Sequence, residues 1–168
     1  MNESVNLYEF KRLIVLFNYQ YRTDKGEEYF NIPISIVRSK RTGRVRYIYS
    51  DNSLIATVKP TNGHLILSLK GAKRFLRVVP KPSSRVIVER SVESIIREGR
   101  NVYSKHVRSC DPLIRPADEV LVVDDGDNLL AVGRALLNGD EMTSFKYGVA
   151  VNVRKGVGDL NDEAEVES

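Results

Sequence analysis

The first regular pattern in the chain is a set of apolar residues spaced by three and four positions. These residues are Leu7, Phe10, Leu13, Ile14, Phe17 and Tyr21. A period near 3.6 places all of them on one face of a helix, so the pattern predicts an amphipathic helix over residues 5–21.

After residue 26 the pattern changes to short segments rich in β-branched and aromatic residues, which are typical of strands. The first three segments are residues 34–38, 45–49 and 54–58. The strongest turn signal is Asn62-Gly63, which precedes a further strand at residues 65–69 and favours a type I′ hairpin with positive φ at both positions. A short helix over residues 71–77 is expected to close this half.

A proline-containing segment, residues 80–84, separates this half from the next. Proline fixes its own φ and biases the residue before it toward extended backbone, so we expect a stiff extended linker. A strand at residues 85–89 follows, and Ser91 is expected to cap a helix. The apolar face of that helix consists of Val92, Ile95 and Ile96. Gly99 suits the left-handed position after the helix.

The second half continues with strand-like segments rather than helical ones. These segments are residues 119–124, 129–137 and 148–155. The order strand, helix, several strands predicts a small mixed β-barrel with one or two short helices. The predicted fold class of the chain is α+β, with a small α/β module before the barrel. The expected divisions are a first domain at 1–79, a linker at 80–84, a barrel domain at 85–157 and a disordered acidic tail at 158–168.

The net charge of +4 conceals an uneven distribution along the chain. Residues 1–80 hold 14 basic and 6 acidic side chains, whereas residues 81–158 hold 12 and 11. Residues 159–168 hold five acids and no base. A basic first half attracts the phosphates of a nucleic acid, although an ordinary solvated surface would have the same composition.

Few residues of this chain are suited to chemistry. Cys110 is the single cysteine, which rules out an intrachain disulfide and fits a reducing cytoplasm. One cysteine and two histidines, His64 and His106, argue against a structural zinc site. The sequence has no nucleophile elbow, phosphate-binding loop or calcium loop. We therefore expect no catalytic residue, metal or cofactor, and the apolar runs are too short to predict a membrane span.

The densest basic cluster lies around the turn at Thr42-Gly43 and forms a predicted basic hairpin. Its members are Arg38, Lys40, Arg41, Arg44 and Arg46. Strand side chains alternate with period two, so Arg44 and Arg46 are expected on one face and Tyr47 and Tyr49 on the opposite, core-facing side. A hairpin with one basic face can follow a phosphate backbone, and the alternative is a solvated hairpin.

Residues 85–156 resemble a PUA domain in several segments that occur in the expected order. The segments are residues 99–107, 111–124, 130–137, 141–142 and 148–154. Residues 39–46 and 62–72 are similar to the domain that precedes the PUA domain in archaeal tRNA-guanine transglycosylase, which exchanges a tRNA guanine for the archaeosine precursor. The chain departs from the family at Ala117, where glycine is common, and at His106, where an aromatic residue is common.

The resemblance implies an RNA-binding chain and not an enzyme, because the barrel with the transglycosylase aspartates and zinc is missing from this sequence. PUA domains of this family dock on the acceptor stem and 3′ end of tRNA. The resemblance assigns RNA binding to Gly99, Arg100, Asn101, Lys105, His106, Arg154 and Lys155. Glycine permits close backbone approach and the basic side chains can contact phosphates. A separately encoded, transglycosylase-like catalytic subunit is the expected protein partner.

Three alternatives remain open from the sequence. The chain could be a free-standing PUA protein that acts in ribosome assembly or translation. It could be a small RNA-modifying enzyme, for which residues 99–107 are the one cluster able to host an activity. It could also hold a protein partner and never contact RNA.

Overall fold

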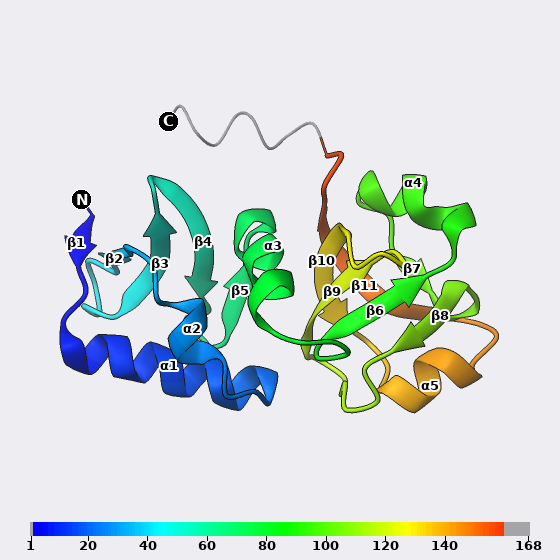
Figure 1. The fold of residues 1–168 in the computed structure, drawn as a ribbon, viewed down its shortest axis with the longest axis horizontal. Coiled ribbons are helices and arrows are strands. Elements are labelled where there is room, and N and C mark those ends of the chain that lie inside the picture. The colour runs from blue at the N-terminus through cyan, green and yellow to red at the C-terminus, as the bar shows by residue number, and fades with distance from the viewer. Residues whose placement is uncertain (1, 160–168) are drawn as a thin grey trace. The chain divides into compact units, whose positions relative to one another are not determined.

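The computed structural model describes residues 2–159, which divide into two compact units, one ending at Val79 and the other beginning at Pro80 (Figure 1). The first unit contains β1 (Glu3–Ser4), α1 (Leu7–Tyr21), α2 (Gly26–Tyr29), β2 (Ser35–Arg38), β3 (Val45–Ser50), β4 (Ser53–Val58), β5 (Leu65–Leu67) and α3 (Leu69–Val78). The second contains β6 (Arg85–Val88), the 3₁₀ turn η1 (Arg90–Val92), α4 (Glu93–Arg97), β7 (Val102–Tyr103), the 3₁₀ turn η2 (Ser104–His106), β8 (Val107–Cys110), β9 (Glu119–Val123), β10 (Leu129–Ala135), α5 (Gly139–Ser144) and β11 (Val149–Gly156). The predicted α+β class is confirmed.

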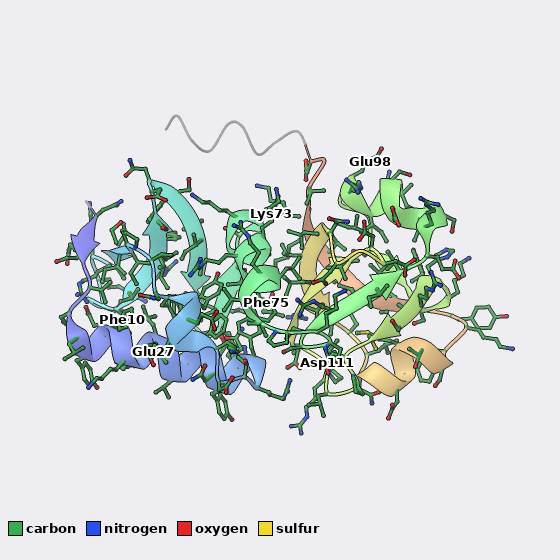
Figure 2. The ribbon with its side chains drawn as sticks, viewed as in Figure 1. Phe10, Glu27, Lys73, Phe75, Glu98 and Asp111 are labelled. Carbon is green, nitrogen blue, oxygen red and sulfur yellow. The ribbon has the colours of Figure 1, made fainter. Side chains whose placement is uncertain are left out.

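The first unit is built on an antiparallel sheet whose strand order, β1-β2-β3-β4-β5, follows the chain. Its helices contribute a core of buried aromatic rings: Phe17, Tyr21, Tyr29, Phe30 and Phe75. The rings of Phe17 and Tyr29 stack with centroids 4.5 Å apart, and Phe75 of α3 lies among the side chains of this unit (Figure 2). Such offset aromatic packing adds specific contacts to the burial of apolar area, and it holds α1, α2 and α3 together.

Local side-chain bonds fix α1 at its beginning and join it to the sheet. Asn6 and Glu9 form a capping box, in which the Asn6 amide oxygen accepts the Glu9 N–H at 2.9 Å. Gln20 pairs with both backbone groups of Leu65, because its amide donates to the carbonyl at 2.8 Å and accepts the N–H at 2.7 Å. The helix predicted from the apolar spacing is confirmed from Leu7 to Tyr21.

The prediction of which face of β3 is buried was wrong. Ile48 is fully buried, and its register partners Ile36 and Ala56 are buried with it. Arg46 precedes Ile48 by two residues and shares its face, so this arginine is half-buried instead of open to solvent. Tyr47 and Tyr49, on the other face, are also only half-buried. Both faces of this strand carry large side chains, and the alternation alone could not tell which one the helices cover.

The type I′ turn lies at a different place from the one predicted. Asp51 and Asn52 both have positive φ, 48° and 61°, between the paired residues Ser50 and Ser53. The hairpin predicted around Asn62-Gly63 is confirmed, since β4 and β5 pair antiparallel, but the type I′ turn there was wrong. Only Gly63 has positive φ (73°), at the end of a loop in which its N–H donates to the Lys59 carbonyl. Short polar residues such as Asp and Asn tolerate left-handed backbone, which explains the Asp51-Asn52 turn.

The second unit is a six-stranded sheet in the order β7-β11-β10-β9-β6-β8, curled into a nearly closed barrel. Its edge strands β7 and β8 are separated in sequence only by the three residues of η2, so the two edges must lie close together. Strands β6 and β9 run parallel, whereas the other neighbours run antiparallel. The predicted mixed barrel is confirmed.

Several local predictions in this unit need correction. The linker residues are not extended as predicted: residues 81–84 form turns, with Ser84 at φ 58° and the Arg85 N–H bonded to the Pro82 carbonyl at 3.1 Å. Ser91 does not cap a helix through its side chain, because it lies within η1. Ile95 is exposed, although Val92 and Ile96 are buried as predicted. The prediction of left-handed backbone at Gly99 is confirmed by its φ of 93°.

Within residues 2–159, no helix is long and apolar enough to cross a membrane. The acidic tail predicted for residues 158–168 lies mostly outside the described residues, which end at Asp159. Gly158 is described, and its N–H donates to the Arg97 carbonyl at 2.8 Å.

Candidate nucleic-acid interface

The candidate interface begins where α4 ends, in the glycine loop, defined here as residues 99–106. The Gly99 N–H donates to the Ile96 carbonyl at 2.9 Å, and the Arg100 N–H donates to the Ile95 carbonyl at 3.2 Å. Gly99, at φ 93°, then turns the chain away from the helix. A side chain is strained in this backbone conformation, so glycine is needed for the turn.

The end of β11 supports the glycine loop from behind. A Cβ on Gly156 would lie 2.1 Å from the Arg97 carbonyl oxygen and 2.7 Å from the Gly99 nitrogen. Two backbones therefore approach each other at a distance that only glycine allows. The Asn101 side chain adds a second link, because its oxygen accepts the Val153 N–H at 2.9 Å.

A pocket of about 510 Å³ opens between α4 and the glycine loop. Its lining residues are Val92, Ile95, Ile96, Arg100, Asn101, Tyr103, Lys105 and His106. Four of the predicted RNA-binding residues thus meet in one concave site. The pocket combines an apolar floor with basic groups, a pattern suited to a base and its phosphate.

Arg100 and Lys105 are the free cations of this pocket. Both side chains are exposed, and neither forms an ion pair with any residue between 2 and 159. His106 differs, since its Nδ1 lies 3.3 Å from a Glu89 carboxylate oxygen. The two long cations can therefore reach an anionic ligand without first breaking an internal bond.

Two other predicted residues lie outside the pocket lining. Arg154, on β11, pairs with both carboxylate oxygens of Glu119, and one of these bonds is 2.7 Å long. Lys155 is half-buried on the same strand, opposite Val132. The expectation that Arg154 faces the glycine loop across a groove stays a prediction.

The basic hairpin offers less charge than its sequence suggests. Arg38 is held by two carboxylates, those of Glu9 and of Glu3, the latter at 2.9 Å. Arg46 lies over the Tyr47 ring at 5.8 Å, and its buried Nε has no hydrogen-bond partner among the described residues. Lys40, Arg41 and Arg44 are exposed around the turn. RNA binding by the hairpin stays a prediction, and it now rests on these three side chains.

Cys110 has no features of a reactive thiol. Burial raises its pKa to about 11, and the neighbouring Asp111 carboxylate contributes in the same direction. Its Sγ lies 3.3 Å from the Gly139 carbonyl oxygen, to which the thiol can donate. The thiolate needed for nucleophilic attack is thus scarce at neutral pH. Among the described residues, no group of three His, Cys, Asp or Glu side chains could hold a metal ion.

The sequence did not assign four of the pocket residues to the site: Val92, Ile95, Ile96 and Tyr103. Ile95 was assigned to the helix core, and Tyr103 lies on a strand of only two residues, too short to show a periodic pattern. An aromatic residue within a basic loop was the available signal, because rings and cations together are typical of RNA contacts.

Residues 84–157, which make up most of the second unit, match the PUA domain family. Residues 11–82 match the patch-forming domain C2 of tRNA-guanine transglycosylase. The chain thus matches the C-terminal, non-catalytic part of the archaeal transglycosylase, as the sequence resemblance implied.

Two curated relatives illustrate the extent of this match. The chain is 43% identical over 147 residues to the tRNA-guanine(15) transglycosylase of Methanocaldococcus jannaschii, covering 87% of this chain and 22% of the relative. It is 41% identical over 147 residues to the enzyme of the same name from Thermococcus kodakarensis, covering 88% of this chain and 25% of the relative. The chain therefore spans about a quarter or less of the length of these relatives.

Solved structures with the same fold are more distant in sequence. A hypothetical protein of Pyrococcus horikoshii superposes with a TM-score of 0.76 at 18% identity, covering 98% of this chain and 99% of its own. A conserved PUA domain protein from Thermoplasma acidophilum gives a TM-score of 0.70 at 19% identity, with the same coverage. These likenesses establish the two-unit fold. The domain matches and the transglycosylase relatives support RNA binding in tRNA modification.

Proposed function

We propose that this chain binds the acceptor end of tRNA and presents the tRNA to a separately encoded, transglycosylase-like catalytic subunit. The observation that supports this most directly is the pocket beside the glycine loop, where Arg100 and Lys105, which have no ion-pair partner within residues 2–159, line the same cavity as apolar side chains. The pocket lies in a PUA domain that follows a transglycosylase C2 domain in the same chain. The curated relatives extend well beyond the part that this chain matches, and the base exchange is proposed to require a region that corresponds to their remainder.

The physical role of this chain is recognition without chemistry. Cations around a concave apolar site attract phosphates and leave room for a base, which gives affinity for an RNA end over a continuous duplex. The raised pKa of Cys110 removes the one thiol as a nucleophile. The base exchange is assigned to the proposed partner, because this chain matches the non-catalytic part of the transglycosylase relatives.

The first test compares intact tRNA with tRNA whose 3′ end has been trimmed by four nucleotides. We expect weaker binding of the trimmed RNA, measured by fluorescence anisotropy at fixed salt, because the pocket loses its occupant. Equal affinity for the two RNAs contradicts docking of the acceptor end. Selective recovery of ribosomal RNA with the purified chain would favour the ribosome-assembly alternative.

The second test measures exchange of labelled guanine into tRNA. We expect exchange only when a catalytic subunit is added, and faster exchange with this chain than without it. Exchange by the purified chain alone would contradict the non-catalytic role. An unchanged rate of the catalytic subunit would contradict the delivery role.

A further inference from the structure

The loop between α5 and β11 exposes two large aromatic rings. Phe145 is 48% exposed and Tyr147 is 87% exposed, with Lys146 between them. The loop is short and defined, since the Phe145 N–H donates to the Glu141 carbonyl at 2.9 Å and Gly148, at φ 92°, turns the chain into β11. Aromatic rings that stay exposed to water at a well-defined turn are unfavourable, because the free energy of burying their apolar area is not gained. Such rings are therefore candidate contact sites.

A third exposed ring belongs to the same surface. Tyr103 on β7 is 49% exposed and pairs in register with Val149, the first residue of β11. The neighbouring Ser104 N–H donates to the Gly148 carbonyl at 3.0 Å. These two bonds place the 145–148 loop directly beside β7. We call Tyr103, Phe145 and Tyr147 the aromatic tip.

All three rings are about half exposed or more. Within residues 2–159, none of them takes part in a ring–ring or cation–ring contact, whereas every such contact involves residues of the first unit. A ring that is packed neither by another ring nor by a guanidinium is free to stack on an incoming flat group.

The aromatic tip is continuous with the basic pocket. Tyr103 lines that pocket together with Arg100 and Lys105, and Lys146 adds a cation between the other two rings. Residues 142–149 and 99–106 contain no acidic side chain. Aromatic rings next to cations, in two segments that contain no acid of their own, complement unpaired nucleotides, whose bases stack and whose phosphates need positive charge.

We infer that the aromatic tip stacks the unpaired nucleotides of the RNA end that enters the pocket. This inference rests on the proposed function and specifies its ligand as a single-stranded extension and not a duplex, because paired bases already stack on each other. Tyr103 contacts the base nearest the pocket, while Phe145 and Tyr147 contact bases further along the strand. Lys146 neutralises a phosphate between them. Stacking tolerates any base, so the tip adds affinity without sequence preference.

The test uses the full chain and two RNA hairpins of identical stem, one with a four-nucleotide 3′ extension and one blunt. The variants are Phe145→Ala, Tyr147→Ala, the double variant, and Tyr147→Phe, which keeps the ring. Leu113→Ala is the matched control, since Leu113 is another large exposed residue of the second unit, at 61% exposure. All five change exposed side chains, so the melting temperature should stay close to that of the unaltered chain.

We expect each lost ring to weaken binding of the extended hairpin by about tenfold, with no change for the blunt one. Tyr147→Phe and Leu113→Ala should bind as the unaltered chain does. A 2-aminopurine placed in the extension should lose fluorescence on binding, because stacking quenches it, and regain it with the double variant. Unchanged affinity and unchanged quenching in the double variant would overturn the inference.

The Lys105→Ala variant separates this inference from the proposed function. If Lys105→Ala weakens binding of the extended hairpin and the double ring variant does not, the pocket binds RNA and the tip does not stack it. If the unaltered chain binds both hairpins equally, the proposed docking of the RNA end fails as well. In a mixture with RNA and the catalytic subunit, the ring variants could keep their RNA binding and fail only to bind the subunit. In that case the aromatic tip is a protein contact and the inference is overturned.

Discussion

The basic hairpin of the first unit and the glycine loop of the second use positive charge in opposite ways. The hairpin concentrates five bases in nine residues, yet Arg38 is neutralised by two carboxylates and Arg46 is half-buried. The glycine loop contains only two long cations, Arg100 and Lys105, and both are unpaired within the described residues and line a pocket. The basic hairpin therefore leaves a smaller share of its cations free for a ligand than the glycine loop does.

This difference shows that charge counted along a sequence is not the charge presented to a ligand. The carboxylates that hold Arg38 come from Glu3 and Glu9, about thirty residues away in the chain. The cations of the glycine loop lie at a concave, partly apolar surface, where the effective dielectric constant is lower and an anion would be bound more strongly. A short basic loop at a pocket can thus contribute more than a longer basic run in open solvent.

The largest effect is expected from Gly156→Ala, which disturbs the support of the glycine loop while leaving every cation in place. The new Cβ would lie 2.1 Å from the Arg97 carbonyl oxygen, so the helix end and the loop must shift. We expect the free energy of unfolding of the second unit to fall by about 1–3 kcal/mol, measured by urea denaturation, with RNA binding reduced as well.

Gly158→Ala is the matched control for this change, because its Cβ would lie 3.2 Å from the same oxygen and needs only a small adjustment. Equal stability of the Gly156→Ala and Gly158→Ala variants would show that the close approach at Gly156 does not support the loop.

The next prediction compares equal losses of charge in the two regions. Arg100→Ala with Lys105→Ala should weaken tRNA binding by about tenfold or more, as expected for two cations at a concave site. Lys40→Ala with Arg41→Ala removes the same charge from the hairpin and should have a smaller effect. When binding is measured between 50 and 200 mM salt, the slope of the logarithm of the binding constant against the logarithm of the salt concentration should become shallower by about 0.7–0.9 for each phosphate contact removed. A greater loss from the hairpin pair would reverse the comparison.

The smallest effect is expected from the ion pair between Arg38 of the basic hairpin and Glu9. The Arg38 guanidinium beside Glu9 holds the pKa of that carboxyl below its ordinary value of 4.5, and partial burial opposes this only in part. Glu9→Gln should therefore lower the melting temperature at pH 7 by no more than about 4 °C, since such exposed pairs contribute little. RNA binding should not decrease.

The pH dependence of this pair follows from the lowered native pKa of Glu9. The ionised carboxylate contributes stability above the unfolded pKa, and this contribution is lost as the pH falls through the lower native pKa. The difference in melting temperature between the Glu9→Gln variant and the unaltered chain should therefore shrink as the pH falls below the ordinary carboxyl pKa of 4.5 and vanish below the lowered native pKa. Glu27→Gln, which alters an exposed acid on α2, should show no such convergence.

Elements with a long apolar period could be predicted from the sequence, and elements defined by partners could not. The spacing from Leu7 to Tyr21 is enough to identify α1, and β-branched runs identify β2, β3, β4, β9, β10 and β11. Strand β7 has two residues and exists only because β11 pairs with it. The Asn62-Gly63 signal misled because a turn type depends on loop length as well as on its residues.

The residues of the candidate site could likewise be predicted only in part. The resemblance located Gly99, Arg100, Asn101, Lys105 and His106, and the structure places the last four around one pocket. The neutralisation of Arg154 by Glu119 could not be foreseen, because the two residues become neighbours only through β9, β10 and β11. Tyr103 and Ile95 were missed because their exposure depends on the surrounding fold.

Because β7 pairs with β11, the pocket can form only late in the synthesis of the chain. Asn101, Tyr103 and Ser104 are translated early in the second unit, but their partners Val153, Val149 and Gly148 leave the ribosome more than forty residues later. Until then the glycine loop lacks its hydrogen bonds to β11, and the barrel is incomplete. The RNA binding proposed for this pocket therefore has to wait until β11 has emerged and the fold is complete.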